Sequence, residues 1–361
     1  MRVPQYAKRS LAALALSAMV ACGGDSTAPD APFDPNGTSS DIAALQSSFD
    51  SPATAGFDAA SGAIADVLEF SPAGAAVRVM PTRALVAGGK PDAGHYAATV
   101  AKAYRRPGGS IAAYSTAAAI PAEYLGVTFT YNAETDQYQA SELSGAPENG
   151  VRFLVYATNP ISGMIIEPVV EVGYADIVVT ESATAASVRI ELVSAGVTYL
   201  DYTVGIAGGT SSATVSVTGF VSNGDDRVDF DLDTQITAEP LTLTVDYALI
   251  VPTRGGFRLD FEGEVIVETS TSSSTLQARG PHGTVTITGD HSANSGTFEV
   301  EVNGEPFATI AYTTGQEPVI TGADGQALTQ QELEALAEVF AVFIQGFDFV
   351  EDLLDPLAGG V

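Results

Sequence analysis

Apolar and polar residues alternate along much of the chain, most clearly in residues 226–237. There Val228, Phe230 and Leu232 fall on one side of an extended strand, and the intervening aspartates fall on the other. A period of two predicts strands with one buried and one hydrated face, and therefore an antiparallel sheet. The same reasoning predicts strands at 127–131, 151–157, 175–180, 186–193, 197–206, 212–221, 241–251, 257–268, 275–279, 283–289, 296–302 and 307–314.

Short runs of turn residues, such as 222–226 and 253–256, separate these segments. Many of the predicted strands are longer than the usual length of about five or six residues. Long strands joined by tight turns form a meander, which curls because a wide twisted sheet does not stay flat. We therefore predict a mainly β fold with flanking helices. Its antiparallel meander covers residues 126–321, curves into a half-barrel or barrel, and packs on a C-terminal helix.

A helical period replaces the alternation near the C-terminus. Thr329 and Glu332 have the spacing of a capping box, which starts a helix. We expect this helix over residues 329–355, in the concave side of the sheet. Its wide apolar stripe consists of Leu333, Leu336, Ala337, Phe340, Phe343, Ile344 and Phe347.

The aromatic part of this stripe supports two hypotheses. In the first, the three phenylalanines pack against inward-facing strand residues such as Phe230, Val245 and Phe261. In the second, they contact an apolar ligand held between helix and sheet. The candidate ligand-binding residues on the helix are Phe340, Phe343 and Phe347.

Two short helices are predicted within residues 41–70, because apolar residues recur there at helical spacing. Residues 71–125 are rich in alanine, and their pattern favours no single structure. Together with the meander and the C-terminal helix, these parts form one predicted domain over residues 41–361. The apolar faces of the two helices are Ile42, Leu45 and Phe49, and Ile64, Val67 and Leu68.

The N-terminus has a different composition. Three basic residues and no acidic one lie within the first ten positions, before an apolar run over residues 11–21. The run is too short to span a bilayer as a helix, and this order is typical of a secretory signal peptide. The only cysteine of the chain, Cys22, follows directly. Residues 19–22 resemble the lipobox of bacterial lipoproteins, with Met19 where leucine is usual.

This resemblance implies that residues 1–21 are a lipoprotein signal peptide and that Cys22 carries the lipid. The lipidated cysteine would attach the protein to a membrane of the cell envelope, and Gly23 in the next position implies the outer membrane. Residues 22–40 are rich in Gly, Ser, Pro and Asp, which predicts a flexible tether. The alternative is a small buried cysteine in a secreted protein.

The charge of the chain restricts its partners. Lys and Arg number 15 against 44 Asp and Glu, a net charge of −29. Removal of residues 1–21 makes it about −32, and such a surface repels nucleic acids, so we expect no nucleic-acid partner. One cysteine allows no disulfide framework within the chain. The apolar content of 45% is enough for a packed core.

Catalytic and metal-binding motifs are missing from the sequence. It contains no nucleophile elbow, H-E-x-x-H helix or P-loop, and composition alone does not decide on a Ser-His-Asp triad, which is recognised by geometry. His282 and His291 lie near each other in sequence, with Asp290 beside the second. A hairpin could bring these two histidines together in a metal site. The alternative, which we expect, is that both lie exposed in loops. We therefore expect no catalytic residue, metal or cofactor.

Carboxylates line the polar side of three neighbouring predicted strands, 226–237, 241–251 and 257–268. A calcium site needs about six to eight oxygens that converge on one point, whereas a strand face spreads its side chains apart. We expect a hydrated face that keeps the sheet soluble.

Aromatic residues flank a turn within residues 127–138. Phe129, Tyr131 and Tyr138 would form a hairpin with cross-strand aromatic packing, or the rim of a binding site for a planar ligand. We retain Tyr131 and Tyr138 as candidate ligand-binding residues.

These features predict an envelope lipoprotein that is not an enzyme and that binds an apolar small molecule or an envelope protein. Two alternatives are a structural or interaction protein with a fully packed core, and a hydrolase without a recognisable motif. A cavity of about 300–1,000 Å³ would favour ligand binding. Convergence of a serine or carboxylates with His282 or His291 in a cleft would favour the hydrolase.

Overall fold

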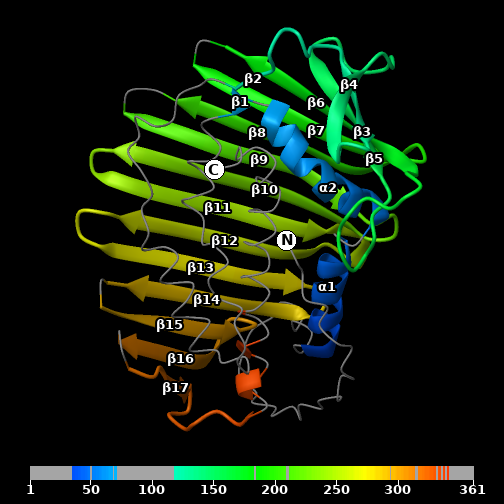
Figure 1. Cartoon of the computed structure of the whole chain (residues 1–361). Coiled ribbons are helices and arrows are strands. Elements are labelled where there is room, and N and C mark those ends of the chain that lie inside the picture. Colours follow the sequence, from blue (N-terminus) through cyan, green and yellow to red (C-terminus); the bar gives the residue numbers. More distant parts are fainter. Residues whose placement is uncertain are drawn as a thin grey trace.

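The computed structural model describes residues 35–48, 51–67, 69–70, 118–182, 184–208, 211–292, 294–313, 316–330, 332–334, 336–337 and 340 (Figure 1). Its helices are α1 (Pro35–Ser47), α2 (Pro52–Val67) and the short 3-10 helix η2 (Pro252–Arg254). Two short strands, β1 (Glu69–Phe70) and β2 (Ala118–Ala119), pair with each other. The remaining strands are β3 (Thr128–Asn132), β4 (Gln137–Ser141), β5 (Gly150–Tyr156), β6 (Glu171–Glu181), β7 (Ala185–Ser194), β8 (Val197–Gly208), β9 (Ser212–Ser222), β10 (Arg227–Ala238), β11 (Leu241–Val251), β12 (Phe257–Ile266), β13 (Thr271–Gly280), β14 (Gly283–His291), β15 (Ser295–Val302), β16 (Glu305–Thr313) and β17 (Val319–Gly322).

Strands β3 to β17 form one sheet of fifteen strands among the described residues. From β5 to β17 each strand pairs antiparallel with the next strand in sequence, which confirms the predicted antiparallel meander. The prediction of a closed barrel is wrong for the described residues. Closure requires the first and last strands to pair, but β4 and β17 are the two edges of the sheet and pair on one side only.

The beginning of the meander also differs from the prediction. Strand β3 lies between β4 and β5, antiparallel to β4 and parallel to β5. The parallel pairing places Phe129 beside Phe153, and the Arg152 amide donates to the Val127 carbonyl over 3.0 Å. The regular meander therefore starts at β5. The hairpin of β3 and β4 lies at its edge, where it supplies the aromatic residues of the site described below.

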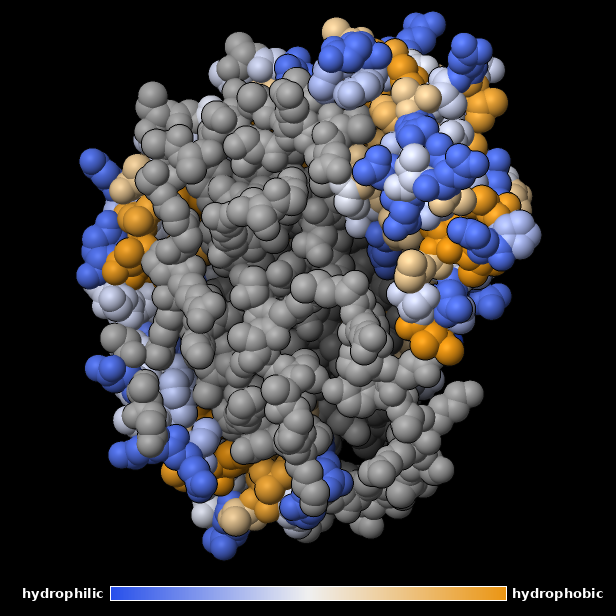
Figure 2. All heavy atoms as spheres, viewed as in Figure 1, coloured by the Kyte–Doolittle hydropathy of each residue, from blue (hydrophilic) through white to orange (hydrophobic). Residues whose placement is uncertain are grey.

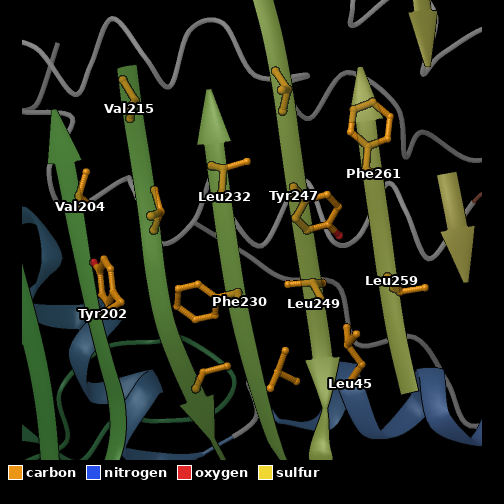
Figure 3. Close-up of a cluster of buried hydrophobic side chains, with 14 of the residues drawn as sticks. Leu45, Tyr202, Val204, Val215, Phe230, Leu232, Tyr247, Leu249, Leu259 and Phe261 are labelled. Atoms are coloured by element: carbon orange, nitrogen blue, oxygen red, sulfur yellow. The ribbon is translucent and has the colours of Figure 1, made fainter. Parts of the chain in front are cut away.

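Strand register produces one continuous buried face. Leu232 of β10 is opposite Tyr247 of β11, which is opposite Phe261 of β12. The row continues through Leu276 and Ile287 of the next two strands. Figure 3 shows the inward side chains of β8 to β12 on this face, together with Leu45 of α1. Burying a side chain of this size contributes about 1.5–3 kcal/mol, so this face is the core of the fold.

Helices α1 and α2 lie against the apolar face of the sheet (Figure 1). Ala53, Phe57, Ala60 and Ile64 recur at helical spacing on α2 and are buried. Gly56 permits close approach, since a Cβ there would lie 2.5 Å from Val155 Cγ1 of β5. The two helices confirm the coarse prediction for residues 41–70.

Helix α1 corrects the N-terminal boundary. It begins at Pro35, inside the segment 22–40 that we predicted to be a tether. Proline suits the first turn of a helix because its fixed φ and missing N–H cost nothing there. The Gly- and Pro-rich composition hid this start. None of the described helices is long and apolar enough to cross a membrane.

The predicted capping box at the C-terminus is present. The Thr329 amide donates to Glu332 Oε2 over 2.7 Å, and the Glu332 amide donates to Thr329 Oγ1 over 3.3 Å. Gln330, residues 332–334, Leu336, Ala337 and Phe340 have helical backbone. The Phe340 side chain is fully buried and its ring meets that of Phe298 edge-on, with centroids 5.7 Å apart. The rest of the predicted helix, with Phe343 and Phe347, lies outside the described residues, so the helix over 329–355 stays a prediction.

Candidate functional site

A cavity of about 600 Å³ lies where α2 meets β3, β4 and β5. Ala59 and Ala63 of α2 form one wall, and residues 163–165 of the loop between β5 and β6 form another. Asp136 and Gln137 add polar groups. Aromatic rings supply the remainder of the wall: Tyr124, Phe129, Tyr131, Tyr138 and Phe153. We call this cavity the tyrosine pocket.

The aromatic rings of the tyrosine pocket pack in two layers. Phe129 and Phe153 stack with centroids 4.7 Å apart and an interplanar angle of 10°. Tyr138 meets Phe153 edge-on at 5.6 Å. Tyr131 and Tyr138 are direct cross-strand partners, and their rings lie 5.8 Å apart. Such contacts are worth about 0.5–1.5 kcal/mol beyond burial, so the cluster is a fixed part of the fold.

A third tyrosine completes the upper layer. The Tyr156 ring lies 6.2 Å from Tyr131 and 6.3 Å from Tyr138, tilted by 51° and 48°. The irregular register of β5 at Val155 and Tyr156 positions this ring. Burial raises the pKa of both Tyr138 and Tyr156 above the ordinary value for tyrosine. Both side chains therefore remain neutral phenols at ordinary pH.

Hydrogen bonds orient two of these rings. The Tyr131 hydroxyl donates to the Asp136 carboxylate, and this bond, more than burial, raises the pKa of Tyr131 to about 12. Asp136 occupies the left-handed region at φ 54° in the turn between β3 and β4. The Tyr138 hydroxyl donates to the Leu154 carbonyl over 3.0 Å. The turn and the neighbouring strand thus hold the tyrosine rings in place.

The loop between β5 and β6 presents apolar side chains beside the tyrosine pocket. Ile161 is 84% exposed and Met164 is 64% exposed. Backbone hydrogen bonds hold the loop: the Asn159 amide donates to the Met164 carbonyl over 2.8 Å, and the Ala157 amide donates to the Val170 carbonyl over 2.9 Å. Figure 2 shows apolar surface on the side of the molecule that carries β3 to β5. A held loop with exposed apolar residues is typical of a binding surface.

The sequence predicted part of this site. It placed Phe129, Tyr131 and Tyr138 about one turn, and the structure confirms the hairpin with cross-strand aromatic packing. It did not identify Tyr124, Phe153 or Tyr156 as neighbours, because only the parallel pairing of β3 with β5 brings them together. We expected a ligand cavity beneath the C-terminal helix, whereas the tyrosine pocket lies against α2.

The histidines lie apart. His282 is in the turn before β14 and His291 is the last residue of that strand, so they do not form one metal site. The expectation that both are exposed in loops is wrong for His291, which is 5% exposed and packs on Phe298 at 4.5 Å. Its Nδ1 is 3.0 Å from the Tyr312 hydroxyl. Gly296 makes room, since a Cβ there would lie 2.3 Å from His291 Nδ1.

Ser272 is the cross-strand partner of His291, but its hydroxyl makes no hydrogen bond to any described residue. The bond between nucleophile and base that a serine hydrolase uses is therefore not formed in this arrangement. His282 instead faces Asp41 of α1, with Nε2 and Oδ2 3.7 Å apart. Burial raises the pKa of Asp41 above its ordinary value, while the His282 and Arg254 charges act in the opposite direction. These contacts join α1 to the ends of the strands.

Carboxylates form a row across the outer face, as the sequence indicated. Asp233 is directly opposite Asp246, which is directly opposite Glu262. Burial raises the pKa of Asp233, and the charges of Asp231 and Asp246 add to this effect. The described residues contain no group of three or more His, Cys, Asp or Glu side chains arranged to hold a metal ion.

Comparison with known proteins gives no relative from which to transfer a function. No protein-family model and no curated protein matches this sequence, and no solved structure matches the fold.

Proposed function

We propose that this chain is a non-enzymatic lipoprotein of the cell envelope whose tyrosine pocket binds an apolar small molecule. The observation that carries the proposal is the cavity of about 600 Å³ with five aromatic rings in its wall. Small-molecule sites are typically clefts of about 300–1,000 Å³, lined by apolar and aromatic side chains with a few polar groups. Asp136, Gln137 and the tyrosine hydroxyls are the polar groups here.

The sequence supports attachment to a membrane. The basic start, the apolar run 11–21 and Cys22 have the order of a lipoprotein signal, and Gly23 favours the outer membrane. Each buried methylene of a lipid contributes about 0.8 kcal/mol, and stable anchoring needs more than one chain. A diacylglycerol on Cys22 would supply two. Ligand binding would then occur at the membrane surface, where apolar molecules concentrate.

The C-terminal helix belongs to the same proposal as a structural element. We propose that residues 329–355 form a helix on the apolar face of the sheet and help to shield this face from water. We also propose that the sheet curves into a half-barrel around this helix. Phe340 is fully buried against Phe298, as expected of a core residue. A fully buried Phe340 does not suit the ligand-binding role that the sequence suggested for it, so Tyr131 and Tyr138 remain the candidate ligand-binding residues among the described residues.

Calorimetric titration with 2-naphthol, a planar uncharged aromatic molecule, tests the pocket. Ala63→Leu fills the cavity from α2. Gly62→Leu adds the same side chain at the neighbouring exposed position, where a Cβ has no atom within 4 Å. We expect saturable binding to the unsubstituted chain and to Gly62→Leu, and at least about tenfold weaker binding to Ala63→Leu, because a tenfold change corresponds to about 1.4 kcal/mol of lost contact.

Equal affinities of Ala63→Leu and Gly62→Leu would place 2-naphthol elsewhere and contradict the proposal. The same holds if no saturable binding is measured. Far-UV circular dichroism of both variants establishes that the sheet is intact before binding is compared.

A second candidate function rests on the loop between β5 and β6. Ile161 at 84% exposure and Met164 at 64% form an apolar surface that would fit an apolar patch on an envelope protein. A photo-reactive amino acid at position 161 tests this in intact cells. A discrete protein adduct supports a protein partner, and recovery of the chain without an adduct supports the small-molecule function alone.

A further inference from the structure

Two tyrosine rings of the pocket wall, Tyr131 and Tyr138, pack beside the ring of the buried Tyr156. The Tyr131, Tyr138 and Tyr156 centroids are separated by 5.8, 6.2 and 6.3 Å. None of the three pairs is stacked, since the interplanar angles are 63°, 51° and 48°. A cation seated between Tyr131 and Tyr138 lies within about 6 Å of both centroids, the range of a cation–π contact.

Negative charge surrounds the three rings. Asp136 accepts the hydrogen bond of the Tyr131 hydroxyl and contributes to the wall of the pocket. The charge of Glu167 acts on Tyr131, and that of Glu171 acts on Tyr156. All three carboxylates are exposed, and negative charge on the surface attracts cations from solution.

No positive side chain competes for this position among the described residues that line the pocket, which include no Lys or Arg. The nearest arginine in sequence, Arg152 of β5, is held elsewhere. Its guanidinium donates to both carboxylate oxygens of Asp176 over 2.6 and 2.7 Å and lies over the Tyr174 ring. The negative potential at the tyrosines is therefore available to a ligand.

The other walls fit the remainder of an organic molecule. Ala59 and Ala63 of α2, with Met164 and Ile165 of the loop, face the same cavity as the tyrosines. A metal ion or a free ammonium ion would leave this apolar surface uncovered. A ligand with a bulky, weakly hydrated cationic group and an apolar body would use both parts.

From these contacts we infer that the tyrosine pocket selects an organic cation, with a quaternary or tertiary ammonium group over Tyr131 and Tyr138 and its apolar body against α2 and the loop. This inference rests on the proposed function, because it concerns the same pocket, and it adds the chemical class of the ligand.

Choline and 3,3-dimethyl-1-butanol test the inference on the purified full chain. The two molecules have nearly the same shape, but only choline is charged. We expect choline to bind severalfold more tightly by calorimetry, because only the charged molecule makes cation–π contacts with Tyr131 and Tyr138. The affinity for choline should also fall as sodium chloride is raised.

Three variants separate the contributions of ring and charge. Tyr131→Phe keeps the ring and should retain the preference for choline, whereas Tyr131→Leu should reduce it severalfold. Asp136→Asn suits the left-handed backbone at this position, where asparagine is tolerated, and should weaken choline binding severalfold without weakening that of the alcohol. The matched control is Glu299→Gln on β15, an exposed residue at the far end of the sheet order, which should change neither affinity.

Equal affinities for choline and the alcohol would overturn the inference. If Ala63→Leu still weakens the binding of 2-naphthol in that case, the proposed function stands and only the cationic class of the ligand is wrong. If neither 2-naphthol nor choline binds, the proposed function fails and this inference fails with it. If Glu299→Gln weakens choline binding as much as Asp136→Asn does, the net charge of the protein explains the effect of Asp136→Asn. This result would also overturn the inference.

Discussion

At the scale of single residues, neighbouring groups determine how exposed a tyrosine of the pocket is and which group its hydroxyl binds. Tyr131 is exposed enough to meet a ligand, yet its hydroxyl is committed to Asp136. Tyr138, its cross-strand partner, is more buried and bonds to the Leu154 carbonyl. Both rings line the pocket, and these two hydrogen bonds fix their orientation.

The bond between Tyr131 and Asp136 predicts a dependence on pH. The pKa of Tyr131 is about 12 in the folded chain against 10.0 for an ordinary tyrosine. Because the folded pKa is raised, this stabilising contribution is complete below pH 10 and is lost as the pH rises to about 12. We expect the tyrosinate absorbance of Asp136→Asn to show one tyrosine ionising at lower pH than in the unsubstituted chain. Superimposable titration curves would contradict the assignment.

Cys22 provides the second prediction at this scale. If the thiol carries the lipid, Cys22→Ser leaves a chain that is uncleaved or released in soluble form. Membrane fractionation and intact-mass measurement check this directly. A variant with unchanged membrane partitioning and the mass of the unsubstituted protein would rule out the lipoprotein signal.

At the scale of elements, the strands combine a regular apolar face with an outer face that contains an unfavourable row. Asp233, Asp246 and Glu262 are in direct cross-strand register on β10, β11 and β12. Basic residues bind other carboxylates nearby: Arg258 contacts Asp260, and Arg279 also reaches Asp260 over 3.3 Å. Like charges directly opposite each other destabilise a sheet, so this row costs stability and keeps the face hydrated.

Removing the middle charge of the row should therefore stabilise the fold. Asp246→Asn keeps the shape of the side chain and removes one charge from both neighbouring pairs. We expect an increase of about 0.5 kcal/mol in the free energy of unfolding at low salt, and less at about 1 M sodium chloride because salt screens the repulsion. Urea denaturation at both salt concentrations is the measurement. A lower stability at low salt would show that Asp246 has a favourable partner instead.

The C-terminal segment offers a graded test. Phe340 is fully buried, so Phe340→Ala should cost about 3–5 kcal/mol once the cavity is included. Thr329→Ala removes only the cap and should cost about 1 kcal/mol. Removal of residues 328–361 should expose the apolar face and cause aggregation. A truncated chain that stays soluble, with unchanged strand signal and unfolding, would mean that the predicted helix packs elsewhere.

The sequence predicted elements with a strong local pattern and missed those without one. The alternation identified β10, β11 and β12 and their inward residues. It missed β17, which has only four residues, and it gave no bounds for β4, the mostly exposed second strand of the predicted hairpin at the sheet edge. The inward position of His291 was readable from the period of two, since Val285 and Ile287 precede it on the same face. The tyrosine pocket could not be predicted from the sequence, because it depends on the pairing of β3 with β5, and β4 lies between these two strands in the sequence.

At the scale of the whole molecule, a wide open sheet buries one face and leaves two edges. The meander brings sequence neighbours together, so most pairings are local, which favours fast formation of each hairpin. Among the described elements, the β3–β4 hairpin, the β1–β2 pair, α1 and α2 depart from this order. The β3–β4 hairpin and α2 build the tyrosine pocket. The departure from the regular meander and the candidate site therefore coincide.

Mass spectrometry of small molecules extracted from the membrane-released protein tests ligand binding most directly. The unsubstituted chain and Ala63→Leu would be purified and extracted with organic solvent in parallel. We predict an apolar organic molecule in the extract of the unsubstituted chain that is depleted from the extract of Ala63→Leu. Extracts of identical composition from the two proteins would contradict the claim that the tyrosine pocket holds a ligand.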